Sequence, residues 1–132
     1  MIVQFGHQIL KGQTPKLFEG SDKILRDFIY IEDVIQANIK ACNPKKSGIY
    51  NVGTGKARSF EDIVNILQKE LEIDNEKEYI PNPYIGSYQF FTEANIQTTK
   101  KFLDYEPRFS LEDGIKAYIP EIKRLFAEEL KW

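Results

Sequence analysis

The stretch PKLFEGSDKILRDFIYIEDV, residues 15–34, constrains the fold of this chain more than any other part of the sequence. Its first proline ends a preceding helical pattern, because a residue before proline is pushed towards extended geometry. Residues 16–18 then predict a short strand, and 19–22 a turn in which Gly20 takes a positive φ. The run FIYI at 28–31 is rich in β-forming side chains and predicts a second strand, buried on both faces.

Around this stretch, apolar residues at helical spacing alternate with short strand-like runs. Glu32 and Asp33 open a helix, where carboxylates complement the helix dipole. Gly12 is placed to cap the first helix at its C-terminus. The predicted helices are 1–11, 32–42, 59–71, 92–103 and one that starts at 110, and the further predicted strands are 49–52 and 79–80.

Helix ends carry recognisable signals. Ser59 and Ser110 each precede an aspartate by three residues, which predicts side-chain capping of two helices. Thr92 is expected to cap a third. Pro120 lies about ten residues into the last helix, so that helix is expected to kink there or to split in two. Lys131 suits the negative end of its dipole.

Composition excludes several classes of protein. The chain has 132 residues, enough for one domain or part of one, and its net charge of −2 argues against a nucleic-acid or anionic-membrane binder. One cysteine and one histidine exclude an intrachain disulfide and a Cys/His zinc site, and no metal is expected. Cys42 is expected to be a buried or half-buried thiol, and His7 a surface or partly buried side chain. Without a signal-peptide profile or a long apolar run, the protein is expected to be cytoplasmic.

Catalytic motifs are missing from the sequence. The glycine-rich GTGKARS, residues 53–59, matches neither a P-loop nor GxGxxG, so it is interpreted as a strand-to-helix turn capped by Ser59. No tyrosine is followed by a lysine four residues on, the pair that short-chain dehydrogenases use. Neither GxSxG nor HExxH occurs. No catalytic residue is therefore assigned.

Two segments remain as candidates for ligand contact. Arg26 follows the EGSD turn, and its guanidinium suits a diphosphate because it pairs two oxygens at once. Phe18 offers a flat face to a base or sugar, while Glu19 and Ser21 suit sugar hydroxyls. The alternative is a surface loop in which Arg26 pairs with Asp27 or Asp22.

The second candidate is the aromatic-rich run PYIGSYQFF, residues 83–91. Such a loop is suited to close over a ligand, with Tyr88 supplying a phenol and a ring face. The alternative is that its aromatic side chains plug the core beneath the loop.

Three of these pieces carry a family resemblance. LRDFIYIEDV at 25–34, GIYNVGTG at 48–55 and Ser59-Phe60 resemble the C-terminal half of extended short-chain dehydrogenase/reductases that act on nucleotide sugars. PKLFEGS and YIPNPYIGSYQFFTEA narrow the resemblance to the ADP-L-glycero-D-manno-heptose 6-epimerase family. The similarity runs through nearly all of the chain.

The resemblance implies an α/β fold in which residues 1–132 form the single C-terminal substrate-binding region of a two-lobed enzyme. In that family, NADP is held by an N-terminal Rossmann half, and C6 of ADP-D-glycero-D-manno-heptose is inverted for the lipopolysaccharide inner core. That half and its catalytic Tyr/Lys pair are absent here, so the chain alone is expected to be inactive. The substrate contacts that carry over are Phe18, Glu19, Gly20, Ser21, Arg26 and Tyr88. A histidine that the family places in the first helix is replaced by Gln4.

Two other functions stay open, namely another nucleotide-sugar epimerase or dehydratase, and a stand-alone sugar-nucleotide binding module without catalysis. The resemblance also implies that the helix at Asp33 and the strand after Gly48 pack against the missing half. Apolar helix faces and strand edges are then left uncovered. The isolated chain is expected to associate with itself or its missing half, or to be marginally stable.

Overall fold

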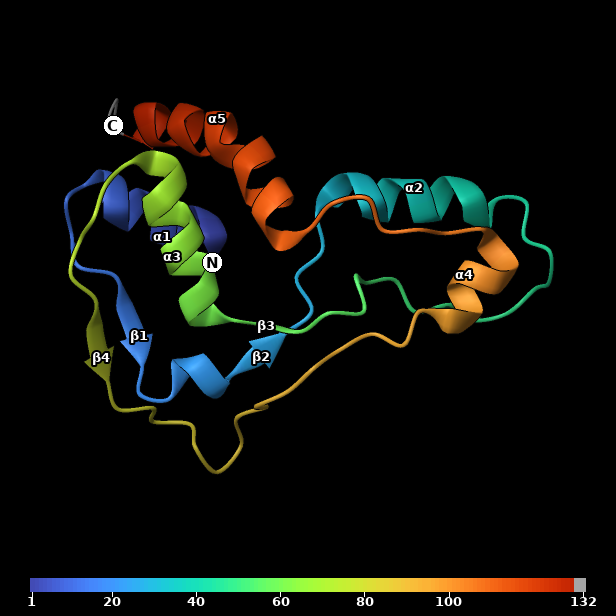
Figure 1. Cartoon of the computed structure of the whole chain (residues 1–132), viewed down its shortest axis with the longest axis horizontal. Coiled ribbons are helices and arrows are strands. Elements are labelled where there is room, and N and C mark those ends of the chain that lie inside the picture. Colours follow the sequence, from blue (N-terminus) through green and yellow to red (C-terminus); the bar gives the residue numbers. More distant parts are fainter. Residues whose placement is uncertain (130–132) are drawn as a thin grey trace.

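The computed structural model describes residues 1–129, which fold into five helices and four short strands. The α/β fold with few short strands is confirmed. Figure 1 shows the order along the chain. The elements are α1 (Ile2–Leu10), β1 (Lys16–Phe18), a 3₁₀ turn (Ser21–Lys23), β2 (Leu25–Arg26), α2 (Ile31–Ala41), β3 (Arg58–Ser59), α3 (Phe60–Leu71), β4 (Glu78–Ile80), α4 (Gln97–Leu103) and α5 (Leu111–Glu129).

The strands form two separate pairs. β1 runs parallel to β4, with Phe18 opposite Ile80. β2 runs antiparallel to β3, with Arg26 opposite Arg58, and Leu25 also bridges to Phe91. These short pairs hold the segments that follow them in place, because backbone N–H and C=O groups near the core need partners.

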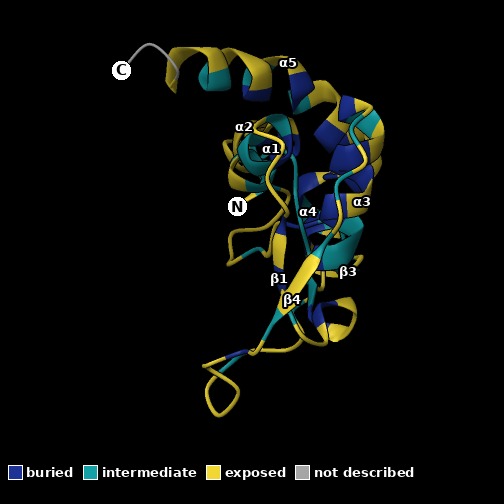
Figure 2. Ribbon diagram, turned by 90° about the vertical axis from the view of Figure 1, so that its left-hand side faces the viewer, coloured by how far each residue is buried: buried dark blue, intermediate teal, exposed yellow. Residues whose placement is uncertain are grey.

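The main core lies between α1, α3 and α5. Ile9, Ile63, Leu67 and Ile122 are fully buried there. Figure 2 shows the buried residues gathered on α3 and on the parts of α5 that face it. A second, smaller cluster joins α2 to α4 and includes Tyr105, and Figure 1 shows these two helices apart from the main core.

Two predicted strands are wrong. Residues 28–31 form no strand, and Ile31 already begins α2. The ring of Phe28 packs edge-on against Phe60, and the ring of Tyr30 packs at a tilt against Phe109. Residues 49–52 also lack strand structure, and Ile49 is 97% exposed. Among residues 1–129 no neighbouring backbone pairs with either run, so β-forming side chains alone do not produce a strand.

Three other predictions fare differently. Thr92 does not cap α4, which begins at Gln97, because residues 92–96 form no helix. Cys42 is exposed rather than buried, since it lies just after the end of α2. α5 continues through Pro120 and changes direction along its length in Figure 1, as a kink requires. Lys131 lies outside the described residues.

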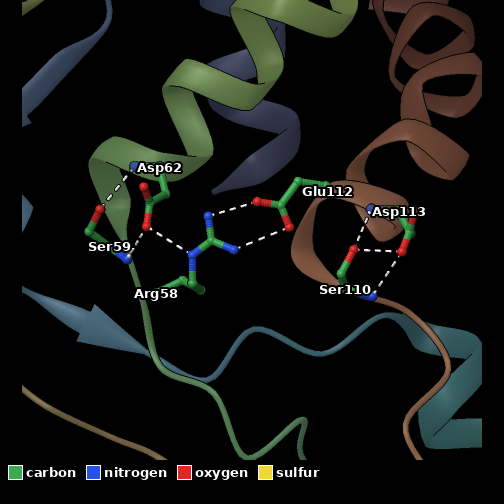
Figure 3. A network of polar contacts seen from close by, with 6 residues as sticks. All are labelled: Arg58, Ser59, Asp62, Ser110, Glu112 and Asp113. Carbon is green, nitrogen blue, oxygen red and sulfur yellow. Dashed lines mark hydrogen bonds and ion pairs between the residues drawn. The ribbon is translucent and has the colours of Figure 1, made fainter.

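Both predicted serine caps are confirmed. The Ser59 hydroxyl accepts from Asp62 N at 3.0 Å, and the Asp62 carboxylate accepts from Ser59 N. Ser110 and Asp113 repeat this reciprocal pair at the start of α5. Figure 3 shows Arg58 between the two helix starts, where its guanidinium donates to Asp62 and, through two nitrogens, to Glu112. This single arginine therefore ties α3 to α5.

The Arg58 contacts make the free energy of unfolding depend on pH. Burial of Asp62 opposes its ionisation, but hydrogen bonds from Arg58 and Ser59 outweigh this and lower its pKa below the ordinary 3.8. The Arg58 hydrogen bonds likewise lower the pKa of Glu112 below 4.5. A lowered folded-state pKa gives stability that is present above the ordinary pKa and is lost as the pH falls.

Arg58→Met is therefore expected to lower the free energy of unfolding at pH 6 by no more than about 1 kcal/mol, since the partners are a third or more exposed. At pH 3 the difference from the parent is expected to shrink. Urea unfolding at both pH values measures it, with Arg108→Met as the control, because Arg108 forms no ion pair within residues 1–129. An equal deficit at both pH values contradicts the prediction.

An apolar stripe lies uncovered on α2. Ile31, Ile35 and Ile39 follow one another at four-residue intervals and are 56%, 50% and 67% exposed. The expected uncovered helix face is thus present. The other side of α2 is anchored by Asp33, whose fully buried carboxylate accepts from the backbone N–H groups of Arg108 and Phe109.

Within residues 1–129, no helix is both long and apolar enough to cross a membrane.

Candidate functional site

A small pocket brings three of the predicted contact residues together. Phe18, Ser21 and Tyr88 line a cavity of about 220 Å³, although the turn and the aromatic loop lie more than 60 residues apart in the sequence. Its remaining walls come from the packed helices and from β1. They are formed by Met1, Phe5, Lys16, Leu17, Ile24 and Phe60.

The turn at 19–22 presents Ser21 to this pocket. Gly20 adopts a φ of +76°, which only glycine takes readily, so the chain reverses directly after β1. Glu19 N donates to Ile80 O at 2.9 Å, which fixes the turn to the end of β4, while the Glu19 side chain is exposed. Ser21 is 1% exposed, yet its hydroxyl has no hydrogen-bond partner within the described part of the chain. A buried hydroxyl without a partner is costly unless a ligand or water supplies one.

Arg26 lies beside the same pocket. Its guanidinium carbon is 6.0 Å from the ring centre of Phe60 and 5.7 Å from that of Tyr88, close enough for cation–π attraction. It donates two hydrogen bonds, to Leu25 O at 2.8 Å and to Gln89 O. Two of the five N–H groups of an arginine are thus used. No carboxylate among residues 1–129 forms an ion pair with Arg26, so the expected alternative pairing with Asp27 or Asp22 is wrong.

The aromatic side chains of the loop 83–91 lie in two different environments. The ring of Tyr88 stands edge-on to Phe18, with ring centres 5.8 Å apart, and lines the pocket. Tyr84 and Phe90, in contrast, are 59% and 48% exposed. The interpretation of these aromatics as core plugs is therefore wrong for all but Tyr88. In Figure 1 this loop lies below β4, away from the helices.

The glycine-rich turn at 53–58 offers no phosphate cradle. Its Thr54 N and Gly55 N, both 2.9 Å away, already donate to the Asp27 carboxylate. The Ser59 cap follows as predicted, but the strand expected before this turn is missing, and the chain instead passes through β3. The residues present here do not fit the pyrophosphate of a dinucleotide cofactor, since a carboxylate fills the place of the anion.

A larger cavity of about 390 Å³ holds none of the predicted residues. Phe28, Leu111 and Tyr118 contribute to its mostly apolar lining, and it opens beside Ile31 on α2. We place the candidate site at the smaller pocket, because that pocket combines a cation with an unpartnered buried hydroxyl. Residues 1–129 bring no three His, Cys, Asp or Glu side chains together as a metal site.

Phe5 and Phe60 are site residues that sequence reasoning missed. Both occupy apolar positions of amphipathic helices, a pattern that indicates the core and gives no signal for a ligand. Only the packing of α1 and α3 around β1 reveals that their rings also border the pocket. Gln4, at the position of the family's histidine, is exposed and does not line it.

Comparison with known proteins agrees with the fold. The family model described as GDP-mannose 4,6 dehydratase matches residues 1–118, so the chain belongs to that family. Over 121 residues it is 39% identical to the ADP-L-glycero-D-manno-heptose-6-epimerase of Brachyspira hyodysenteriae, covering 89% of this chain and 38% of the relative. The expected resemblance to these epimerases is confirmed.

Solved structures give the same result. The ADP-L-glycero-D-manno-heptose-6-epimerase of Helicobacter pylori is 46% identical with a TM-score of 0.83, over 93% of this chain and 37% of that one. The UDP-glucuronic acid 4-epimerase of Bacillus cereus, solved with UDP-glucuronic acid and NAD, is 29% identical with a TM-score of 0.82, over 95% and 40%. The chain thus spans about two-fifths of the length of these relatives.

Proposed function

We propose that the chain is the C-terminal, substrate-binding part of a nucleotide-sugar epimerase that inverts C6 of ADP-D-glycero-D-manno-heptose. The observation that carries this proposal concerns residues 1–129, among which Arg26 has no carboxylate partner and lies beside a pocket with the unpartnered Ser21 hydroxyl. The identity to the two heptose epimerases, 39% and 46%, exceeds the 29% to the UDP-glucuronic acid enzyme, which favours an ADP-heptose.

Each side chain of the pocket suits one part of such a ligand. The unused N–H groups of Arg26 match the oxygens of a diphosphate, and its permanent charge needs no pH adjustment. The rings of Phe18 and Tyr88 suit a flat base or a sugar face. The Ser21 hydroxyl and the exposed Glu19 carboxylate suit sugar hydroxyls.

The cofactor and the chemistry are assigned to the part of the relatives that this chain does not span. We propose NADP there, by resemblance; the Bacillus cereus neighbour contains NAD. The turn at 53–58 does not fit the dinucleotide, because its amides already donate to Asp27. Because the sequence also lacks a Tyr-x-x-x-Lys pair, the 132 residues alone are expected to be inactive.

The partners follow from the same proposal. The uncovered α2 stripe suits burial against the remaining part of a longer, cytoplasmic enzyme or against another copy in a homo-oligomer. Calorimetry with ADP-heptose separates the enzyme from a stand-alone module. Tight binding by the isolated chain favours a module, whereas binding only when the remaining part is added favours the epimerase.

Arg26→Ala tests the site itself. Loss of the guanidinium is expected to weaken ADP binding by about 1.5–3 kcal/mol, because a charged hydrogen bond to the diphosphate disappears. Calorimetry with ADP, with the remaining part of the enzyme added, measures the dissociation constant. Arg124→Ala is the matched control, since that arginine pairs with Glu121 and Glu128 on α5. An unchanged dissociation constant in Arg26→Ala removes this residue from the site.

A further inference from the structure

One carboxylate next to Arg26 has an unusual number of partners. Asp27 accepts four hydrogen bonds, from Thr54 N at 2.9 Å, Gly55 N at 2.9 Å, Ala94 N at 3.1 Å and the Thr54 hydroxyl. Three of these donors are backbone N–H groups from two segments that are about 40 residues apart. A carboxylate bound in this way is held firmly, since each bond to its charge is stronger than a neutral one.

Neighbouring residues pack tightly around the Asp27 carboxylate. A Cβ on the buried Gly53 would lie 2.6 Å from Asp27 Oδ2 and 2.5 Å from the Ala94 side chain, so only glycine fits there. The hydroxyl of the fully buried Tyr105 donates to Gly53 O at 2.7 Å. Burial, with the nearby carboxylates, raises the pKa of Tyr105 to about 12, which keeps this donor protonated. The turn that binds Asp27 is thus itself fixed by the hydrogen bond from Tyr105.

These contacts converge on the segment that carries Arg26. Leu25 N donates to Phe90 O at 2.8 Å, and Thr92 N donates to Leu25 O at 3.0 Å. The two sequence neighbours of Arg26 therefore both bind the end of the aromatic loop or the residues just after it. Leu25 binds Phe90 and Thr92, and Asp27 binds Ala94. Arg26 also donates to Gln89 O in the same loop.

We propose that Asp27 is a positioning residue, which fixes Arg26 in the geometry that binds a nucleotide diphosphate. This inference rests on the proposed nucleotide-sugar site. Four donors hold the Asp27 carboxylate, and it forms no ion pair with the neighbouring Arg26, so the guanidinium stays available to an anion. Fixing Arg26 in advance also lowers the entropy lost on binding.

Asp27→Asn tests the proposal with nearly unchanged shape. One carboxylate oxygen becomes an NH₂ donor, which faces either the Thr54 donors or the N–H groups of Gly55 and Ala94, so one side loses its acceptor. Affinity for ADP is expected to fall roughly tenfold, the equivalent of one charged contact, while affinity for adenosine, which lacks phosphates, changes less than about twofold.

Asp33→Asn is the matched control. Asp33 is another buried carboxylate that accepts backbone N–H groups, from Arg108 and Phe109, but it contacts no residue of the pocket. Its affinity for ADP is expected to equal that of the parent under conditions where both are folded by circular dichroism. In Arg26→Ala, adding Asp27→Asn is expected to cause no further loss, because the two residues act on the same phosphate contact.

The outcomes separate the two proposals. If Arg26→Ala weakens ADP binding and Asp27→Asn does not, or if Asp27→Asn weakens ADP and adenosine equally, the positioning role is wrong and the proposed site stands. If Arg26→Ala binds ADP as the parent does, the proposed diphosphate site is wrong.

Hydrogen exchange provides a measurement that needs no ligand. Asp27→Asn is expected to speed exchange at the amides of Leu25, Thr92 and Ala94 at least about tenfold, because their segment is no longer fixed. Asp33→Asn is expected to leave these three amides unchanged. Equal protection in Asp27→Asn and the parent overturns the positioning role, even if the chain binds no ADP.

Discussion

Gly53→Ala is expected to lower the free energy of unfolding by about 2–4 kcal/mol, an effect of overpacking together with lost hydrogen bonds. The new Cβ would lie 2.5 Å from the Ala94 side chain and 2.6 Å from Asp27 Oδ2, distances at which something must move. Ala94 N donates a hydrogen bond to Asp27, so neither residue can move away from the new Cβ without breaking that hydrogen bond. The Tyr105 bond to Gly53 O is disturbed by the same shift.

Urea unfolding followed by circular dichroism measures this loss, and Gly86→Ala is the matched control. Gly86 has no positive φ and no atom within 4 Å of a Cβ built on it, so its replacement is expected to change stability by less than about 0.5 kcal/mol. If Gly53→Ala is as stable as Gly86→Ala, the packing around Asp27 is looser than the structure indicates.

The isolated chain is expected to associate with itself, and Ile39→Glu to weaken that association by at least about a hundredfold. Burying one isoleucine side chain contributes about 1.5–3 kcal/mol, and in a symmetric contact each substitution counts twice. Ile39 is 67% exposed and continues the stripe of Ile31 and Ile35 on α2. A charge there faces the apolar surface of the partner copy and must be desolvated.

Sedimentation equilibrium over a range of concentrations measures the association. Ile85→Glu is the control, because Ile85 is 68% exposed but lies on the aromatic loop, far along the chain from α2. It is expected to associate as the parent does. A parent chain that stays monomeric, with a sharp melt independent of concentration, contradicts the prediction. Equal weakening by both substitutions places the contact elsewhere.

Local signals in the sequence predicted much of the candidate site. Gly20 adopts the positive φ expected from its turn, and the two serine caps form as predicted. Phe18, Ser21 and Tyr88 meet in one pocket, and Arg26 lies beside it. Short-range chemistry accounts for the turn and the caps, whereas the meeting of these residues was expected only from the family resemblance.

Other features were beyond sequence reasoning because they depend on distant partners. The FIYI run at 28–31 is not a strand, since the nearest strand pairing stops at Arg26. Cys42 ends an apolar pattern, yet it is exposed because α2 leaves that end uncovered. Asp27 was considered only as an ion-pair partner for Arg26, and its bonds to Thr54 and Ala94 span 27 and 67 residues.

The sequence by itself determined where α3 and α5 start and where the chain turns after β1. Each of these depends on residues within a few positions of one another, so local backbone and side-chain chemistry decides them. Only the tertiary structure decided that Arg26 has no carboxylate partner in the described part of the chain and that Asp27 binds two remote backbone segments. Such contacts follow from the packing of the whole chain, which brings 15–34 against the turn at 53–55 and the loop at 83–94.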